Sequence, residues 1–458
     1  MGRVATLAVL VLAAATPDAR ATVDRTVDAG ALRATVTPAP LAVQFSGTTD
    51  LRETQLTTLL GAPLRVVSER REGDAYVATL NGGLTLRLQP RADGVIAQTL
   101  TGGTGPLTAT FAATRDERYL GFGERSNAVD QRGRDVLNHV SEGPYQALEQ
   151  PFIAAFVPLA GYNPREDATY YPVPWLLSTR GYGVLDDDAS GSRFVLSGRD
   201  RWSVTTNGGA QSLRIYGGPT PAQALRRFTA DSGRQPPAAA PWFLGPWWQP
   251  RGGDDANVKT LREAGALGSV VQTYTHYLPC ADHAGRRAAQ KQRTAKFHAA
   301  GLAVTTYFNP MICTRHPRFG AADAAGVLTK NLLGQSYVYR YTGASQFLVG
   351  QFDFSRPEAT AFFGELLREA TDDGYDGWME DFGEYTPQDS VSADGRPGEQ
   401  AHNLYPTLYH RAAHAFTAAF ERPLARFNRS GWTGTAPHAQ IVWGGDPSTG
   451  WGFDGLAS

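Results

Sequence analysis

The pattern of apolar and polar residues changes near residue 235. Before that point, apolar and polar residues alternate over short runs that are separated by Gly, Pro and Asp. Alternation with a period of two predicts half-buried strands, and frequent turn residues favour a β-sandwich. The clearest runs are 64–70, 75–80, 83–90 and 193–198. We therefore predict an N-terminal β-sandwich domain over residues 22–235.

The second half of the chain alternates strand and helix patterns. The stretch 234–242, RQPPAAAPW, predicts a linker, because proline interrupts both helices and sheets. After it, apolar strand candidates alternate with helical patterns such as 358–370, where apolar residues recur at helical spacing. The strand candidates are 242–248, 269–277, 302–310, 376–381, 424–428 and 440–446. This alternation favours a parallel α/β domain over 236–458, and a (β/α)8 TIM-type barrel over a doubly wound sheet.

The strand count falls short of a closed barrel. Eight strand–helix units close such a barrel, and the chain reaches Ser458 soon after the sixth candidate. We expect a barrel with strands one to six only, incomplete at the C-terminus, whose open edge leaves backbone groups unpaired. On this interpretation the chain expressed alone aggregates or shows little activity. A complementary chain, or a complete smaller sheet, is the alternative.

The N-terminus has the three parts of a secretory signal peptide. Arg3 precedes the apolar run 4–15, and Ala19-Arg20-Ala21 follows it. The run is shorter than a comfortable membrane span. We predict a signal peptide over 1–21, cleavage after Ala21, and a secreted or periplasmic protein without membrane contact after cleavage. The alternative is an N-terminal core helix.

Charge and cysteine content exclude some classes of function. The net charge of −1 gives no electrostatic reason to expect nucleic acid as a partner. The spacing of Cys280 and Cys313 does not suit a zinc site, so we expect no metal and no cofactor. The two cysteines follow neighbouring strand candidates, and we predict a disulfide between them, with two buried thiols as the alternative.

Candidate chemistry lies at strand ends. The segment 376–387, DGWMEDFGEYTP, crowds acids around large apolar side chains, which suits a polar site with aromatic walls, because unpaired buried carboxylates are costly. Asp381 and Asp446 each follow a strand candidate beside a Trp, where parallel barrels carry catalytic groups. Two carboxylates facing one bond are the minimal apparatus for glycoside hydrolysis. Helix capping is the alternative for both.

Three further residues have open roles. Glu380 competes with Asp381, and because successive strand residues point to opposite faces, only one of them enters the barrel mouth. Arg429 either contacts sugar hydroxyls or Asp381, or forms a surface salt bridge. Gln272, in an apolar strand, is either a sugar contact or a satisfied core amide.

Four segments carry a family resemblance. GWMEDFGEY resembles the nucleophile region of glycoside hydrolase family 31, and IVWGGDPSTGW resembles that family's acid/base region. Upstream, YLGFGERSNAVDQRG (119–133) and YYPVPWLLSTRGYGVL (170–185) resemble two segments of its N-terminal β-sandwich. The matches follow the family's order, so the chain is identified as a member.

The resemblance implies a retaining enzyme that cleaves α-linked oligosaccharides or other α-glycosides by double displacement. It places Asp381 as the nucleophile and Asp446 as the acid/base, and implies that Glu380 points away from the sugar. We expect the two aspartates to face one site about 5–6 Å apart, with the pKa of Asp446 raised. The expected substrate contacts are Gln272, Arg429, Trp443, Trp378 and Glu384.

The sugar in the glycone site stays open. The main expectation is an α-glucosidase-like enzyme; the alternatives are an α-xylosidase, a sulfoquinovosidase, or a non-catalytic carbohydrate-binding protein. The DFGE form is similar to sulfoquinovosidases and α-xylosidases. Sulfoquinovosidases hold the sulfonate with an Arg and a Trp after strand two, where this chain has HAGRRAAQKQR (283–293), with arginines but no Trp.

Overall fold

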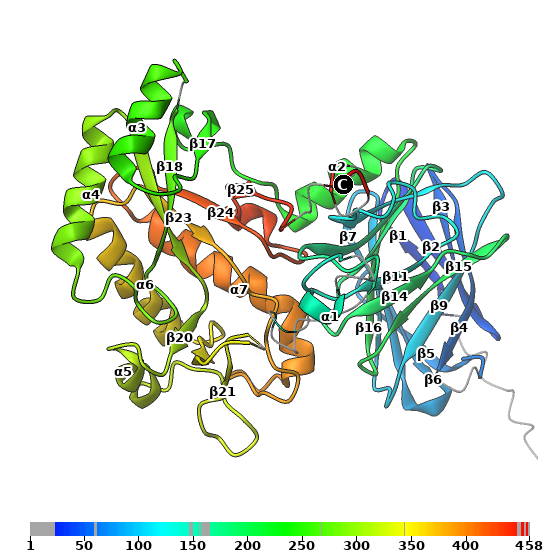
Figure 1. The fold of residues 1–458 in the computed structure, drawn as a ribbon. Coiled ribbons are helices and arrows are strands. Elements are labelled where there is room, and N and C mark those ends of the chain that lie inside the picture. Colours follow the sequence, from blue (N-terminus) through cyan, green and yellow to red (C-terminus); the bar gives the residue numbers. More distant parts are fainter. Residues whose placement is uncertain are drawn as a thin grey trace, which may run out of the picture.

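The structure is a computed structural model, and it places a β-rich part beside a mixed α/β part (Figure 1). It describes residues 23–58, 62–145, 150–153, 155, 157, 165–266, 268–342, 344–446, 450–452 and 455–456. The predicted signal peptide and its cleavage site lie outside these residues. Within the described ranges, no helix has the length and apolar character needed to cross a membrane.

The N-terminal part is a sandwich of two antiparallel sheets, as predicted. One sheet has the order β1-β2-β3-β4-β9-β15-β14-β11, and the other β10-β12-β13-β16-β8-β7-β6-β5. In the strand over Leu32–Pro38, buried and exposed residues alternate, so one face packs into a core that contains Phe45, Phe111 and Trp202. The strands of the first sheet are β1 Thr26–Asp28, β2 Leu32–Pro38, β3 Leu41–Gly47, β4 Leu51–Thr58, β9 Leu107–Ala112, β15 Arg201–Thr206, β14 Ser192–Val195 and β11 Asp135–Asn138. Those of the second are β10 Tyr119–Gly123, β12 Pro172–Ser178, β13 Gly183–Asp186, β16 Gln211–Tyr216, β8 Val95–Thr101, β7 Thr85–Ala92, β6 Ala75–Leu80 and β5 Val66–Glu72.

The second part is built on a parallel sheet of six strands in the order β17-β18-β19-β23-β24-β25. Sheet order follows chain order, as in a barrel, and this excludes the reversed order of a doubly wound sheet. The fold is therefore an incomplete TIM-type barrel, as predicted. Its strands are β17 Trp247–Trp248, β18 Val270–His276, β19 Ala303–Phe308, β23 Gly377–Glu380, β24 Ala425–Asn428 and β25 Ile441–Val442. The helices over the whole described chain are α1 Gln150–Ile153, α2 Pro221–Ser232, α3 Asp254–Glu263, α4 Arg287–Ala299, α5 Phe319–Ala324, α6 Pro357–Asp372 and α7 Gly398–Ala418.

Two predicted strands are shorter than expected. Residues Pro241–Leu244 form a 3₁₀ turn rather than a strand, because proline cannot donate to a ladder and Gly245 N–H instead bonds the Trp242 carbonyl. In the segment 440–446, only Ile441–Val442 pairs with β24. The residues after it form the loop that carries Asp446. The pattern also does not predict a small antiparallel sheet after β19, made of β20 Met311–Cys313, β22 Leu348–Gln351 and β21 Val338–Arg340.

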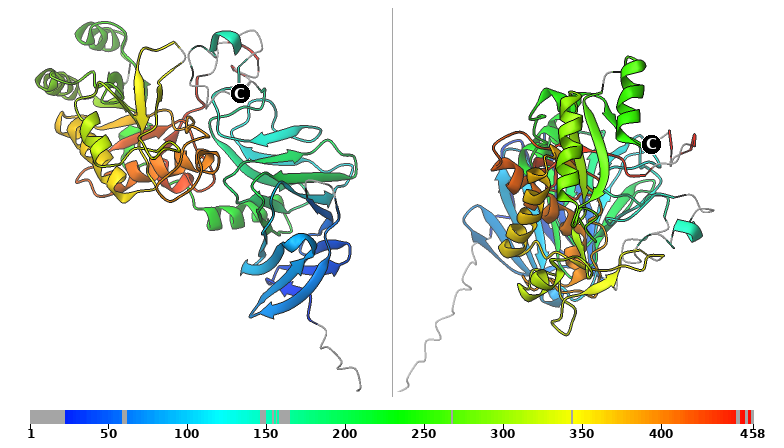
Figure 2. Two further views of the ribbon diagram at one scale, coloured as in Figure 1. Left: turned by 90° about the horizontal axis from the view of Figure 1, so that it is seen from below. Right: turned by 60° about the vertical axis from the view of Figure 1, so that its left-hand side comes forward.

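The start of α7 connects the two parts through buried polar groups. His402 lies between the carbonyls of Thr386 and Val140, with nitrogen–oxygen distances of 2.9 and 2.7 Å. The Asn403 side chain accepts from Val140 N–H and donates to the Ala189 carbonyl, both at 2.9 Å. The left view in Figure 2 shows the sandwich (blue to green) beside the α/β part (green to red). The sandwich is thereby fixed beside the sheet that carries the candidate catalytic residues.

Cys280 and Cys313 form the predicted disulfide, with Cα atoms 4.8 Å apart. The bond joins the segment after β18 to β20, and the two cysteines are 33 positions apart in the sequence. We predict that denatured, unreduced protein shows no reactive thiol. Replacing both cysteines with serine should lower the free energy of unfolding by about 2–4 kcal/mol, since the unfolded chain regains loop entropy. Two reactive thiols in the unreduced protein would contradict the assignment.

Candidate active site

The candidate catalytic residues gather at the C-terminal edge of the parallel sheet. Asp381 directly follows β23, Arg429 directly follows β24, and Asp446 lies in the loop after β25. The Arg429 guanidinium contacts both aspartates: Nε lies 3.0 Å from Asp381 Oδ1, and Nη1 lies 3.7 Å from Asp446 Oδ2. The two carboxylates therefore face the same site. Their predicted separation of about 5–6 Å stays a prediction.

Asp381 is held in a defined orientation. Its residue is 8% exposed, the Tyr307 hydroxyl donates to Oδ2, and the Phe382 N–H donates to Oδ1 at 2.9 Å. Phe382 adopts a φ of 63°, in the left-handed region that is costly for a bulky residue. This turn, together with Arg429, fixes the direction in which the Asp381 carboxylate points.

Arg429 is the centre of the site. It is 2% exposed, and besides the two aspartates it contacts Glu384 and Glu142, the latter through Nη2 at 3.3 Å. Burial alone would lower the pKa of Arg429, but Asp381, Glu142 and Glu384 together raise it well above its usual value. Arg429 is thus a permanent cation in contact with Asp381, and the surface salt bridge considered from the sequence is wrong.

Aromatic rings clamp the guanidinium from two sides. Its central carbon lies 4.5 Å from the ring centroid of Tyr170 and 4.9 Å from that of Phe382. Cations over aromatic faces are attracted by the ring quadrupole, more strongly where water is excluded. Tyr170 comes from the sandwich and Phe382 from the barrel, so both parts of the molecule hold Arg429.

Glu384 does not reach the open site. It is completely buried, and the substrate contact expected for it is therefore wrong for this structure. Burial raises the pKa of Glu384 to about 8, and the charges of Glu142 and Asp381 add to this while Arg429 opposes it. Glu384 therefore lies against Arg429 as a carboxyl group whose ionisation burial disfavours.

Asp446 has the electrostatic surroundings expected of a general acid. Its side chain is 70% exposed, so solvent and substrate can reach it. Partial burial raises the pKa of Asp446, Asp381 and Glu142 raise it further, and Arg429 lowers it. The direction of this shift agrees with the expectation from the sequence.

The loop that presents Asp446 rests on the sandwich. A Cβ atom added to Gly445, whose φ is 76°, would lie 2.0 Å from a Tyr170 ring carbon. One added to Gly444 would lie 3.1 Å from Glu124 Oε1. The two glycines before Asp446 thus permit a close approach that a side chain at position 445 would prevent.

An aromatic face lies beside both aspartates. Tyr274, on β18, is 46% exposed, and its ring stacks on Tyr307 with centroids 5.4 Å apart. Burial raises the pKa of Tyr274, and the charges of Asp381 and Asp446 raise it further, which places its hydroxyl within their field. Trp443 packs edge-on against Phe427 at 5.2 Å and is partly exposed. Its role as a subsite wall stays a prediction.

Two expected substrate contacts are wrong. Gln272 is 6% exposed, and its amide NH₂ donates to the carbonyls of Thr273 (2.9 Å) and Thr306 (3.0 Å). Its amide oxygen accepts a hydrogen bond from the Thr305 hydroxyl. Gln272 is therefore a core amide with its hydrogen bonds satisfied, the alternative considered from the sequence. Trp378 is completely buried on the opposite face of β23, where its indole donates to Glu380 at 2.9 Å.

Glu380 points away from the site, as predicted. Its carboxylate is fully buried between Arg426, at 3.0 Å, and His410 Nδ1, at 2.6 Å. Burial alone would raise the pKa of Glu380, but Arg426 and His410 hold it below its usual value. The alternation of strand side chains thus separates a structural ion pair from the catalytic face.

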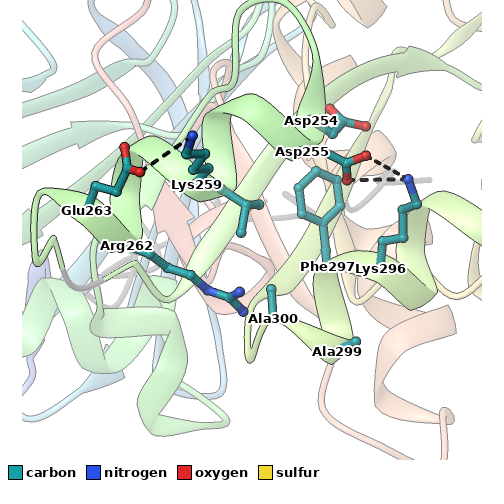
Figure 3. A pocket seen from close by; sticks show the side chains of 10 residues that line it. Asp254, Asp255, Lys259, Arg262, Glu263, Lys296, Phe297, Ala299 and Ala300 are labelled. Atoms are coloured by element: carbon teal, nitrogen blue, oxygen red, sulfur yellow. Dashed lines mark hydrogen bonds and ion pairs between the residues drawn. The ribbon is translucent and has the colours of Figure 1, made fainter.

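Two hollows lie in the described part of the chain. Figure 3 shows the first, about 430 Å³, between α3 and α4 and away from the aspartates. The exposed Lys296–Asp255 ion pair joins the two helices there, and the exposed Lys259–Glu263 pair lies along α3. The second, about 460 Å³, adjoins the aromatic face and is lined by Tyr274, Arg286, Arg293 and neighbouring residues. Among the residues described, no group of His, Cys, Asp and Glu could hold a metal ion.

The residues that the sequence did not single out come mainly from the sandwich. Glu142 and Tyr170 reach Arg429 across the domain contact, and Tyr307 reaches Asp381 from the neighbouring strand. Tyr170 lies in a segment that resembles the family, and this resemblance could have marked it as a candidate site residue. Glu142 has no comparable local pattern, because its role exists only once the two parts meet.

Comparisons with known proteins agree with this geometry. A glycosyl hydrolase family 31 TIM-barrel domain model matches residues 283–454, and a family 31 N-terminal galactose mutarotase-like domain model matches residues 15–194. A two-domain architecture of sandwich and barrel, with paired carboxylates at the strand ends, defines the class. The chain belongs to glycosyl hydrolase family 31.

Similar proteins include enzymes with different named sugars. The sulfoquinovosidase of Agrobacterium fabrum is 26% identical, over 84% of this chain and 61% of its own length. The α-xylosidase XylQ of Lactiplantibacillus pentosus is 24% identical, over 79% of this chain and 46% of its own length. A solved sulfoquinovosidase from E. rectale, 16% identical, covers 93% of this chain and 69% of its own, with a TM-score of 0.76. The chain thus spans about half to three fifths of the length of these curated relatives.

Glu380→Gln tests the separation of the two faces of β23. The change leaves Arg426 buried without its carboxylate, so we expect the free energy of unfolding to fall by about 3–5 kcal/mol, measured by denaturant titration. Glu358→Gln, which removes an exposed ion pair with Arg356, is the control and should cost about 0–1 kcal/mol. Equal effects of the two changes would contradict the buried role of Glu380.

Proposed function

We propose that this chain forms the catalytic part of a retaining α-glycosidase that acts by double displacement. The observation that supports this most strongly is that two aspartates contact the same guanidinium but have different surroundings. Asp381 is buried and oriented by Tyr307, Phe382 and Arg429. Asp446 is exposed and has a raised pKa. A retaining glycosidase needs one oriented nucleophile and one group that keeps its proton.

Each residue then has a role in the two steps. In the first, Asp381 attacks the anomeric carbon while Asp446 gives its proton to the departing oxygen. In the second, Asp446 takes a proton from water, and that water replaces Asp381 on the sugar. Arg429 fixes the geometry of both carboxylates, and Tyr274 offers an exposed ring on which a sugar can stack.

For the glycone we propose a sulfoquinovosyl group first and a xylosyl group second. The similarity to a sulfoquinovosidase and an α-xylosidase supports these two over the α-glucosidase expected from the sequence. Arg251 lies close enough to Tyr274 to influence its pKa, and Arg286 lines the adjoining hollow, so cationic side chains are available beside the aromatic face. The absence of a Trp from 283–293 favours the xylosyl alternative.

Export of the protein is likewise our proposal. The basic start and the apolar run 4–15 support it. The disulfide between Cys280 and Cys313 is of a kind that persists in oxidising compartments.

The test is a panel of 4-nitrophenyl glycosides assayed with the protein at its natural full length, as wild type and as Asp381→Ala. We expect turnover on α-linked substrates, with the α-sulfoquinovoside fastest, followed by the α-xyloside and the α-glucoside. Asp381→Ala should lower kcat by roughly 10⁴-fold or more, because the covalent step loses its nucleophile.

Several outcomes would contradict the proposal. Activity on β-linked substrates alone would exclude a retaining α-glycosidase of this family. Sugar binding without turnover on any α-glycoside would favour the carbohydrate-binding alternative. A folded Asp381→Ala variant with wild-type turnover would show that another group is the nucleophile.

A further inference from the structure

We propose that Glu142, from the β-sandwich, is a positioning residue that holds the Arg429 guanidinium between Asp381 and Asp446, so that the sandwich completes the active site. The role named for Glu142 rests on the proposed function of the two aspartates. It follows from the contacts of Glu142, from the shape of the guanidinium, and from the charge that Glu142 brings to the site.

The Glu142 carboxylate is itself rigidly held. It is 3% exposed, and its Oε1 accepts hydrogen bonds from the hydroxyls of Tyr145 and Tyr170, each at 3.0 Å. Its Oε2 accepts a hydrogen bond from the Tyr385 hydroxyl. Arg429 Nη1 and Nη2 approach the same carboxylate at 3.5 and 3.3 Å. Two sandwich tyrosines and one barrel tyrosine therefore fix the carboxylate against which the guanidinium rests.

The shape of the guanidinium transmits this fixed position to the aspartates. An arginine fork is planar and rigid, so holding one edge sets the direction of the others. In Arg429, Nη2 contacts Glu142, Nε contacts Asp381, and Nη1 lies toward Asp446. Glu384 also contacts Nη2, so without Glu142 the fork keeps one anionic contact on that edge and loses the one that comes from the sandwich. A displacement of about 1 Å at reacting groups is sufficient to cost roughly 10²-fold in rate.

Glu142 also acts on Asp446 through its charge. The groups whose charges face Asp446 are Arg429, Asp381, Glu142, Tyr170 and Tyr274. Of these, Glu142 and Asp381 raise the pKa of Asp446, and Arg429 lowers it. Removing the charge of Glu142 therefore lowers the pKa of Asp446, and Asp446 then loses its proton at a lower pH.

The main experiment compares Glu142→Gln with wild type on the best α-glycoside. Gln keeps the size of the side chain and removes its charge. We expect kcat to fall roughly 10–100-fold with KM changed less than about threefold, because the loss is in positioning rather than in substrate contact. The basic limb of the pH profile, which reports the general acid, should move to lower pH.

Two further variants separate positioning from stability. Glu117→Gln is the matched control: Glu117 is a buried sandwich glutamate that accepts from Ser178 at 2.6 Å and from Tyr182. It should lower the melting temperature and leave the pH profile unchanged. Glu142→Asp restores the charge and should return the basic limb toward its wild-type position, even where kcat recovers only in part.

The melting temperature tests the contact between Glu142 and Arg429 without any substrate. In a thermal double-mutant cycle of Glu142→Gln and Arg429→Gln, we expect the combined drop in melting temperature to be clearly smaller than the sum of the two single drops, because the residues share one contact. Additive drops would overturn the inference. So would an active wild type whose pH profile and kcat are unchanged in Glu142→Gln. Inactivity of the wild type at its natural full length toward every glycoside would instead count against the proposed function.

Discussion

A single buried guanidinium, that of Arg429, organises the site. Four carboxyl groups contact it: Asp381, Asp446, Glu142 and Glu384. Three of these groups, Asp381, Glu142 and Glu384, are buried, and one cation cannot balance three buried anions. Burial raises the pKa of Glu384 to about 8, which relieves the excess of negative charge. Partial burial raises the pKa of Asp446 and the charges of Asp381 and Glu142 add to this, a shift in the direction that acid catalysis needs.

The two faces of β23 show how neighbouring acids acquire different roles. Glu380 faces the helical layer, where Arg426 and His410 keep it ionised in a dry environment. Asp381, one residue later, faces the strand ends and Arg429. Buried ion pairs are costly to form and more costly to break. The ion pairs of Glu380 with His410 and Arg426 therefore connect β23 to α7 and β24. The turn at Phe382 directly follows this fixed end of the strand.

The sequence predicted much of the fold and part of the site. Apolar patterns located the sandwich and the six parallel strands, because strand burial follows a local period. They overextended the strand at 242–248, where prolines impose a 3₁₀ turn. The faces of Glu380 and Asp381 followed from the family resemblance. Gln272 and Trp378 were assigned wrongly, because their orientations depend on neighbouring strands and helices that spacing alone does not show. Glu142 could not be predicted, since its partner Arg429 is 287 residues away across the domain contact.

The most direct test of the central role of Arg429 is the turnover of Arg429→Lys. Lysine keeps the positive charge but replaces the planar fork with a single ammonium group, which cannot contact Glu142, Asp381 and Asp446 in fixed directions. We expect a folded protein whose kcat on its best α-glycoside falls roughly 10²-fold or more. A folded Arg429→Lys variant with kcat within about threefold of wild type would show that charge alone suffices, and would contradict the account.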